Sequence, residues 1–242
     1  MKIIHEPSKE APFIVLYKDS GIPSAPLIPD EYCALNFAAG LFPELLKVRG
    51  KKEIEHGLVH RIDTQTNGLI LIAASQECYD FFIEAQMKGQ FEKWYRAEFD
   101  RIPGLHDLLP GFPPLPSGLP NLADVGGSFC LESFFRPFGQ KGREVRPVTK
   151  DGGMAAKKKA GGIAYSTEIT LISEETALCH IKRGFRHQVR CHLAWCGLPV
   201  KNDIVYNPGC RNLAESPGEM KFSACKISFP HPLTHEPQVF QM

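Results

Sequence analysis

The sequence predicts an α+β fold built as one compact unit. Short runs rich in β-branched and aromatic residues alternate with amphipathic helical segments along most of the chain, which is typical of a sheet with flanking helices. The composition is that of a globular protein, with 43% hydrophobic residues. Because domains usually run to roughly 100–200 residues, the 242 residues are expected to form a single domain over 1–242.

The first part of the chain contains three predicted strands and two predicted helices. Apolar or alternating runs predict strands at 13–17, 69–74 and 93–99. Helical spacing of apolar residues predicts helices at 31–39 and 76–87. Asp30 and Ser75 are the expected N-caps of these two helices, since both side chains accept hydrogen bonds from backbone N–H groups in a first turn.

In the middle of the chain, the sequence pattern predicts little regular secondary structure. From 102 to 162 the periodicity largely fails, and residues 103–120 are dense in Pro, Gly and Leu. We expect a loop-rich insertion or a flap at about 102–162, with a basic, solvent-facing stretch over 141–159 that includes Arg146. Order returns with predicted strands at 164–172 and 177–181, followed by a predicted helix at 186–196.

The net charge and the cysteines bear on the partners and the cellular compartment of the protein. The formal net charge is +1, so any case for nucleic-acid binding must rest on local clusters of basic residues. Eight cysteines occur without a Cys-x-x-Cys pair, and we see neither an export signal nor a membrane-spanning run. We therefore expect a cytoplasmic protein with reduced thiols and no membrane association.

The first candidate site is the polar loop that contains Asp63. This loop precedes the apolar strand predicted at 69–74, so Asp63 would be accessible yet attached to a rigid element, as a catalytic carboxylate requires. The alternative is an Asp that hydrogen-bonds its own turn, together with Thr64 and Thr66. For an isolated Asp-x-x-Thr, that alternative is favoured.

The second candidate site is a basic segment near the predicted helix at 186–196. No acidic residue occurs between Glu175 and Asp203, whereas five basic residues do. They are Lys182, Arg183, Arg186, Arg190 and Lys201. Arg186 and Arg190 would lie one turn apart on one helix face and could point together at phosphates or at a carboxylate. The alternative is a solvated basic face.

Other chemistry has less support. Tyr95 lies in a predicted strand, where a tyrosine is more often a core residue than a catalyst. The histidines and cysteines between 179 and 196 lack the short paired spacings of a zinc site, so we expect no metal. No glycine-rich nucleotide loop is visible, so we expect no cofactor either.

Taken together and in chain order, the Asp63 loop, the strand with Tyr95 and the basic segment resemble the RluA-type family of RNA pseudouridine synthases. Residues 60–68 are similar to the family's His-Arg-Leu-Asp-x-x-Thr-Ser-Gly, 93–95 match its Lys-x-Tyr, and 187–192 are similar to its His-Gln-Ile-Arg-x-His. The resemblance spans nearly the whole chain. One departure is Phe185, where the family usually has an arginine; Arg186 stands one place later. No S4-type RNA-binding domain fits ahead of Lys18.

The resemblance implies a mixed, mainly antiparallel sheet flanked by helices, with a central catalytic cleft. It implies isomerisation of a specific uridine in rRNA or tRNA to pseudouridine, with RNA as partner, no cofactor and a monomeric enzyme. Asp63 would act as nucleophile or base at the ribose. Tyr95 would pack on the flipped uracil and help proton transfer, and Arg190, or alternatively Arg186, would pair with Asp63. The residues expected to bind RNA are His60, Arg61, Thr66, Arg183, Arg186, His187 and Gln188.

Two other classes of function stay open on the sequence. The departure at Phe185 allows an RNA-binding homologue without activity. A carboxylate-dependent glycosidase is the other, but that chemistry usually needs two positioned carboxylates, and the segments around Asp63 and Arg190 offer one.

Overall fold

The chain forms two compact units. The computed structural model describes residues 1–28, 30–119, 122, 125–213 and 218–242. Unit 1 comprises Met1–Trp94 and Ser223–Met242, and unit 2 comprises Tyr95–Phe222. The chain passes between the units within two strands, β4 (Glu92–Glu98) and β9 (Phe222–Pro230). The single domain expected over 1–242 stays a prediction.

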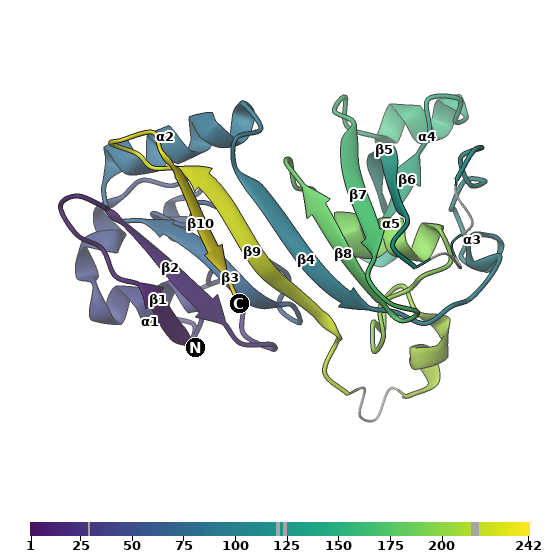
Figure 1. The fold of residues 1–242 in the computed structure, drawn as a ribbon, viewed down its shortest axis with the longest axis horizontal. Coiled ribbons are helices and arrows are strands. Elements are labelled where there is room, and N and C mark those ends of the chain that lie inside the picture. Colours follow the sequence, from purple (N-terminus) through teal and green to yellow (C-terminus); the bar gives the residue numbers. More distant parts are fainter. Residues whose placement is uncertain (29, 120–121, 123–124, 214–217) are drawn as a thin grey trace. The chain divides into compact units, whose positions relative to one another are not determined.

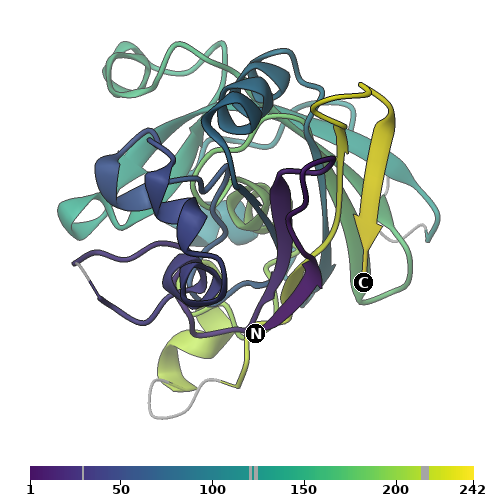
Figure 2. The same cartoon turned by 90° about the vertical axis from the view of Figure 1, so that its left-hand side faces the viewer.

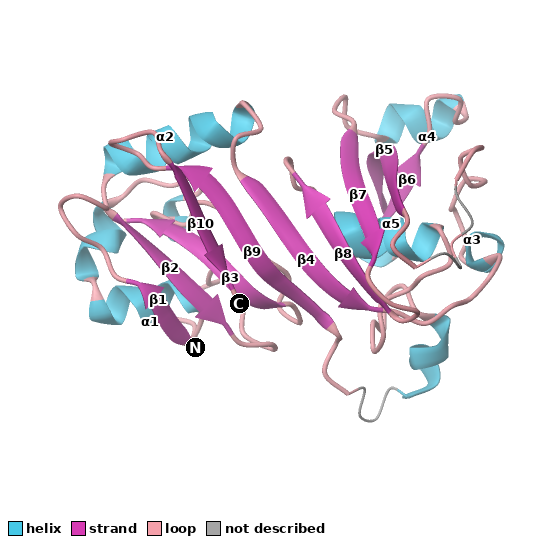
Figure 3. Cartoon of the chain, in the orientation of Figure 1, coloured by secondary structure: helices cyan, strands magenta, loops and turns pink. Residues whose placement is uncertain are grey.

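The strands pair in the order β1-β2-β3-β9-β4-β8-β7-β5-β6, with β10 on β9 (Figure 1). Helices accompany the sheet in both units (Figure 3). The pairing of β3 with β9 is parallel, whereas β1–β2, β2–β3, β5–β7 and β7–β8 are antiparallel. The predicted mixed, mainly antiparallel sheet with flanking helices is confirmed. None of the described helices is long and apolar enough to cross a membrane.

Unit 1 holds both chain termini (Figure 2). Its other strands are β1 (Lys2–His5), β2 (Phe13–Lys18), β3 (Asn67–Ala73) and β10 (Pro237–Gln241). Its helices are α1 (Ala34–Leu41) and α2 (Gln76–Met87), with short 3-10 turns at Pro43–Lys47 and Glu53–Glu55. β2 pairs with β3 along its whole length, from Phe13 opposite Ala73 to Lys18 opposite Gly68.

An aromatic core joins α2 to the strands of unit 1. Phe13 of β2 meets Phe82 of α2 and Phe229 of β9 edge to face, at ring distances of 5.7 and 5.4 Å. Ser75 caps α2 by accepting the N–H of Cys78, and the predicted bounds of this helix are confirmed. These contacts give β2 and β3 a packed support.

The expected cap of the first helix is wrong. Asp30 has a left-handed backbone with φ of 63°, and α1 begins at Ala34. Its N-cap is Cys33, whose sulfur accepts the N–H of Asn36 at 3.3 Å. A thiol is a poor match to the usual capping residues, so the sequence pattern favoured the nearby aspartate.

Unit 2 contains the remaining strands and helices. The strands are β5 (Ser128–Phe138), β6 (Glu144–Val148), β7 (Tyr165–Leu171) and β8 (Thr176–Ile181). The helices are α3 (Leu105–Leu108), α4 (Met154–Lys159) and α5 (Gln188–Trp195), with 3-10 turns at Gln140–Gly142 and Pro208–Leu213. All eight residues of α5 are buried, so this helix forms the centre of the unit.

The structure corrects the expectation of a largely irregular segment at 102–162. The eleven-residue strand β5 and its antiparallel partner β6 lie within it. β5 alternates buried Phe129, Leu131, Ser133 and Phe135 with more exposed residues, a strand signal that the neighbouring prolines and glycines obscured. Residues 120–121 and 123–124 of the segment lie outside the described residues. Its status as an insertion stays a prediction.

Gly68 is required where β3 begins, because β9 runs close beside it. Its φ is +123°, and a Cβ there would lie 2.6 Å from the backbone nitrogen of Ala224 and nearer still to its carbonyl oxygen. We expect Gly68→Ala to lower the free energy of unfolding by about 3 kcal/mol through backbone strain and overpacking. Gly40→Ala in α1 is the control, since Gly40 has open space around it, and should raise that energy by about 0.5–1 kcal/mol. Urea denaturation measures both; equal effects would contradict the account.

Candidate active site

Asp63 lies in a loop of unit 1 whose backbone is held from both sides. On the N-terminal side, the Ser24 hydroxyl donates to the carbonyl oxygen of Ile62 at 2.8 Å and accepts the Ile62 N–H at 3.1 Å. Ser24 and Ile62 are both buried, so no water competes for these groups. The peptide unit before Asp63 is therefore fixed by one side chain.

On the C-terminal side, the end of β2 and the turn after it hold the loop. The Lys18 ammonium donates to the carbonyl oxygen of Thr64 at 3.1 Å, and the Gly21 N–H donates to the same oxygen at 2.8 Å. The Ser20 hydroxyl donates to the carbonyl oxygen of Gln65 at 2.9 Å. We call these contacts from 18–24 to 62–65 the loop clamp. They lie next to Asp63 without using its carboxylate.

Main-chain groups also close a turn at this point. The Thr66 N–H donates to the carbonyl oxygen of Asp63 at 3.0 Å. Thr66 is buried, and its hydroxyl has no hydrogen-bond partner among the described residues. Asp63 itself is half-buried. The turn anticipated from the sequence thus exists, and the backbone of Asp63 closes it.

Lys18 connects the loop clamp electrostatically to Asp63. Burial lowers the pKa of Lys18 to about 8, while the carboxylates of Asp63 and Asp19 act in the opposite direction. The ammonium also donates to the carbonyl oxygens of Asp19 and Ile22, at 3.0 and 2.6 Å. A buried cation satisfied by backbone oxygens therefore lies within electrostatic range of Asp63.

The two residues before Ile62 occupy different environments. His60 is buried, its Nε2 accepts the N–H of Leu71 at 3.2 Å, and its ring meets Phe91 at 5.0 Å. Burial and the neighbouring Lys93 hold the pKa of His60 well below its usual value, so this ring is neutral. Arg61, by contrast, is 56% exposed and forms an ion pair with Glu55 at 2.7 Å. Of these two predicted RNA-binding residues, Arg61 presents its charge to solvent.

Strand β4 contributes Lys93 to unit 1 and Tyr95 to unit 2. Lys93 is buried above the ring of Phe91, 4.8 Å from its centroid, and burial lowers its pKa to about 8. Tyr95 is also buried, and its ring stacks on Phe222 with centroids 5.1 Å apart and planes 8° apart. The Tyr95 ring is thus held in one orientation by aromatic packing.

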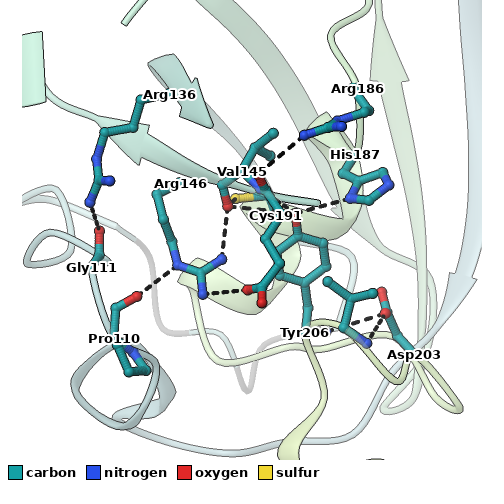
Figure 4. Close-up of polar contacts among 12 residues, drawn as sticks. Pro110, Gly111, Arg136, Val145, Arg146, Arg186, His187, Cys191, Asp203 and Tyr206 are labelled. Atoms are coloured by element: carbon teal, nitrogen blue, oxygen red, sulfur yellow. Dashed lines mark hydrogen bonds and ion pairs between the residues drawn. The ribbon is translucent and has the colours of Figure 1, made fainter. Parts of the chain in front are cut away.

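Arg190, in unit 2, forms a bidentate ion pair with Asp203. Its Nε lies 2.8 Å from Oδ2 and its Nη2 lies 2.7 Å from Oδ1. Asp203 also accepts the N–H groups of Val205 and Tyr206, at 2.9 and 3.2 Å (Figure 4). Asp203 was not among the predicted site residues, although it is the first acidic residue after the basic segment. A pairing of Arg190 with Asp63 stays a prediction.

The expectation that Arg186 and Arg190 share a helix face is wrong. His187 has a left-handed backbone with φ of 57°, so α5 begins at Gln188 and Arg186 precedes it. The exposed Arg186 guanidinium donates to the carbonyl oxygen of Gly142 and, at 3.2 Å, to that of Glu144. Figure 4 shows Arg186 beside Val145, the residue that follows Glu144. Arg190, inside α5, is buried.

Gln188 and His187 are tied to the interior of unit 2. Gln188 donates to the Ser166 carbonyl oxygen at 2.9 Å and accepts the N–H of Phe185 at 2.9 Å. The His187 Nδ1 lies 3.2 Å from the Tyr206 hydroxyl (Figure 4). The Phe185 ring stacks on Phe135 with centroids 5.1 Å apart. The residue that departs from the family pattern is therefore partly buried and packs against the core of unit 2.

Arg146 is another buried arginine, contrary to the expectation of a solvent-facing position. It donates to the carbonyl oxygens of Pro110 and Val145 at 2.8 and 2.9 Å, and to the Glu144 carboxylate at 2.6 Å (Figure 4). Its guanidinium also lies 4.1 Å from the centroid of the Phe138 ring. Arg146 thus serves the packing of the 102–162 segment.

The predicted site residues therefore fall into two groups. Unit 1 brings His60, Arg61, Asp63 and Thr66 together on one loop. Unit 2 brings exposed Arg183 and Arg186 together with half-buried His187 and buried Gln188 and Arg190. Among the described residues, no three His, Cys, Asp or Glu side chains group as metal ligands.

The Arg190–Asp203 pair should matter strongly for stability. We expect Asp203→Asn to lower the free energy of unfolding by about 3–5 kcal/mol, because it removes the carboxylate charge from a bidentate ion pair that is buried on both sides. Glu175→Gln is the control; it breaks an ion pair with Lys201 at the surface and should leave stability nearly unchanged. Denaturant titration of both variants measures their free energies of unfolding. A small loss of this free energy in Asp203→Asn would contradict the stabilising role of the ion pair.

Comparisons with known proteins agree on one family. The model of the RNA pseudouridylate synthase family matches residues 12–195. The tRNA pseudouridine(31) synthase of Saccharomyces cerevisiae is 26% identical over 228 residues, which cover 86% of this chain and 47% of that protein. YlyB of Bacillus subtilis, named an uncharacterized RNA pseudouridine synthase, is 25% identical over 182 residues, covering 74% of this chain and 49% of that protein. The chain thus spans about half the length of these relatives.

A solved structure supports the fold. The human RNA pseudouridylate synthase domain containing 1 superposes with a TM-score of 0.65 at 16% identity, over 99% of this chain and 82% of that one. At this identity the likeness concerns the fold alone. The family match over most of the chain confirms the resemblance drawn from the motifs: the chain belongs to the RNA pseudouridylate synthase family.

Proposed function

We propose that this protein isomerises uridine in RNA to pseudouridine, with Asp63 as the catalytic carboxylate. The observation that carries the proposal is the loop clamp, which fixes the backbone on both sides of Asp63 by hydrogen bonds, buried at Ile62 and part-buried at Thr64. A carboxylate that acts at one atom of a bound sugar gains from such fixation, because the reacting groups are then already oriented. Family membership supplies the reaction.

The reaction exchanges one bond to the ribose for another. The bond between uracil N1 and the sugar carbon C1′ breaks, the base turns, and a bond forms between C5 and C1′. The hydrogen on C5 leaves to solvent as a proton, and N1 becomes protonated. Since uridine and pseudouridine are isomers, no oxidant or reductant is consumed. Asp63 would act at the ribose as nucleophile or base.

The target nucleotide must leave its base stack before a carboxylate can reach its sugar. Extrusion of a base costs a few kcal/mol, which contacts with the RNA backbone must offset. The exposed Arg183 and Arg186 of unit 2 and Arg61 of unit 1 present charge for phosphates. We propose that Tyr95 packs on the flipped uracil and that Arg190 orients Asp63. The substrate would be an rRNA or a tRNA.

Asp63→Asn tests the proposal directly. It keeps the shape of the side chain but removes the charge, so we expect tritium release from RNA that carries 5-tritiated uridine to fall by about a thousandfold or more. Asp19→Asn is the matched control, because Asp19 also faces Lys18 electrostatically, and it should retain activity.

Undiminished release by Asp63→Asn would remove Asp63 from catalysis. RNA binding by the wild-type chain without tritium release would indicate an inactive homologue. Release of free uracil would indicate a glycosidase. Either result would contradict the proposed isomerisation.

A further inference from the structure

Unit 2 contains a cavity whose lining includes none of the candidate site residues. It has a volume of about 330 Å³, within the range of small-ligand sites. Its walls come from β5, β6, α4 and the residues that follow α4, which lie together in unit 2 (Figure 1). The lining residues are Phe134, Val148, Lys150, Lys157, Ala160, Gly161 and Gly162.

The cavity has an aromatic floor. Phe134 and Val148 are direct partners in the β5–β6 pair, so their side chains share one face of the sheet. The next residue, Phe135, packs in the core with its ring 5.0 Å from that of His192. Because side chains alternate along a strand, Phe134 points to the other face. It is half-buried, which leaves part of its ring available to a planar ligand.

The rim of the cavity is basic. Lys157 belongs to a run of three exposed lysines at the end of α4. Lys150 contacts the Glu132 carboxylate at 3.2 Å, but the two side chains are 76% and 47% exposed. Such surface pairs are weak and readily exchanged for a phosphate. Residues 128–163 contain eight Lys and Arg against three Asp and Glu. Their formal net charge is therefore +5, whereas that of the whole chain is +1.

The open side of the cavity is formed by glycines. Gly161 and Gly162 are exposed, and a Cβ at either position would meet no atom within 4 Å. With no side chains there, a sugar–phosphate chain can approach the protein backbone closely. An aromatic face beside lysines is the usual combination for a single-stranded nucleic acid, in which bases stack and phosphates are neutralised. An acidic peptide would pair with the lysines but would leave the ring face without a planar partner.

We propose that this cavity binds one unstacked base of the RNA substrate. Phe134 stacks on the base, and Lys150 and Lys157 contact the adjoining phosphates. The inference rests on the proposed function in one respect, that the ligand is RNA. It adds a contact in unit 2 that is separate from Asp63 and from the basic segment before α5.

Two probes of equal charge test the cavity. One is a fluorescein-labelled oligouridylate of twelve nucleotides, and the other is the same ribose–phosphate chain without bases. By fluorescence anisotropy, Phe134→Ala should weaken oligouridylate binding roughly tenfold and leave abasic binding unchanged, as expected for one lost base stack. Phe134→Tyr should bind both probes like the wild type, and thermal melts establish that the variants are folded.

Lys157→Gln should weaken binding of both probes and reduce the slope of log affinity against log salt by about 0.7, as for one lost phosphate contact. Lys9→Gln, with the same charge change at an exposed site of unit 1, is the control and should leave the slope unchanged. Equal loss of both probes in Phe134→Ala, or no loss of either, would overturn the proposal. So would equal slopes for Lys157→Gln and Lys9→Gln.

Tritium release by the wild-type chain separates this inference from the proposed isomerisation. A base-selective loss in Phe134→Ala without any wild-type tritium release would support the cavity and overturn the isomerase proposal. Tritium release by the wild-type chain with no base-selective loss in Phe134→Ala would support the isomerase proposal and overturn the cavity proposal.

Discussion

The loop clamp is the interaction on which the rest of the site depends. A loop that follows a buried segment carries peptide groups that need partners, since an unpaired buried N–H or C=O is costly. Ser24 and Lys18 supply those partners for Ile62 and Thr64. Because Lys18 ends β2, which pairs with β3 along its length, the clamp is anchored in the sheet of unit 1. The position of Asp63 thus follows from strand pairing and two polar side chains.

Charge in unit 2 is divided between interior and surface. Arg190 and Arg146 are buried, and their guanidinium groups are held by carboxylates, Asp203 and Glu144. Such pairs fix geometry, and they withdraw both arginines from contact with solvent. The exposed Arg183 and Arg186 keep their charge at the surface. Within the basic segment Lys182–Lys201, Arg190 is therefore held inside unit 2, whereas Arg183 and Arg186 keep their charge available to an anionic ligand.

Periodic and well-capped elements were the predictable part of the fold. α2 has an amphipathic face and a serine cap, and its bounds were predicted to the residue. β3 contains the uninterrupted apolar run 69–73, and its bounds were predicted to within two residues. β5 was missed because Pro137 and the turn residues after it masked its alternation. The start of α5 was misplaced because a left-handed histidine has no sequence signature.

The site was only partly predictable for a physical reason. Asp63 was identified through motifs, but the loop that carries it is fixed by Ser24 and Lys18. These two residues lie about 40 residues earlier in the chain and contact backbone atoms of the loop. Contacts to backbone atoms leave no pattern in side-chain types. The same holds for Arg146, whose carbonyl partners made it look like one more exposed cation.

Ser24→Ala tests the role of the loop clamp most directly, by the rate of tritium release at saturating RNA. The variant keeps the carboxylate and loses both hydrogen bonds to Ile62, so we expect the rate constant to fall by about tenfold or more with little change in KM. Ser24→Thr, which keeps the hydroxyl, should restore most of that rate. A folded Ser24→Ala variant with the wild-type rate constant would contradict the claim that the clamp positions Asp63.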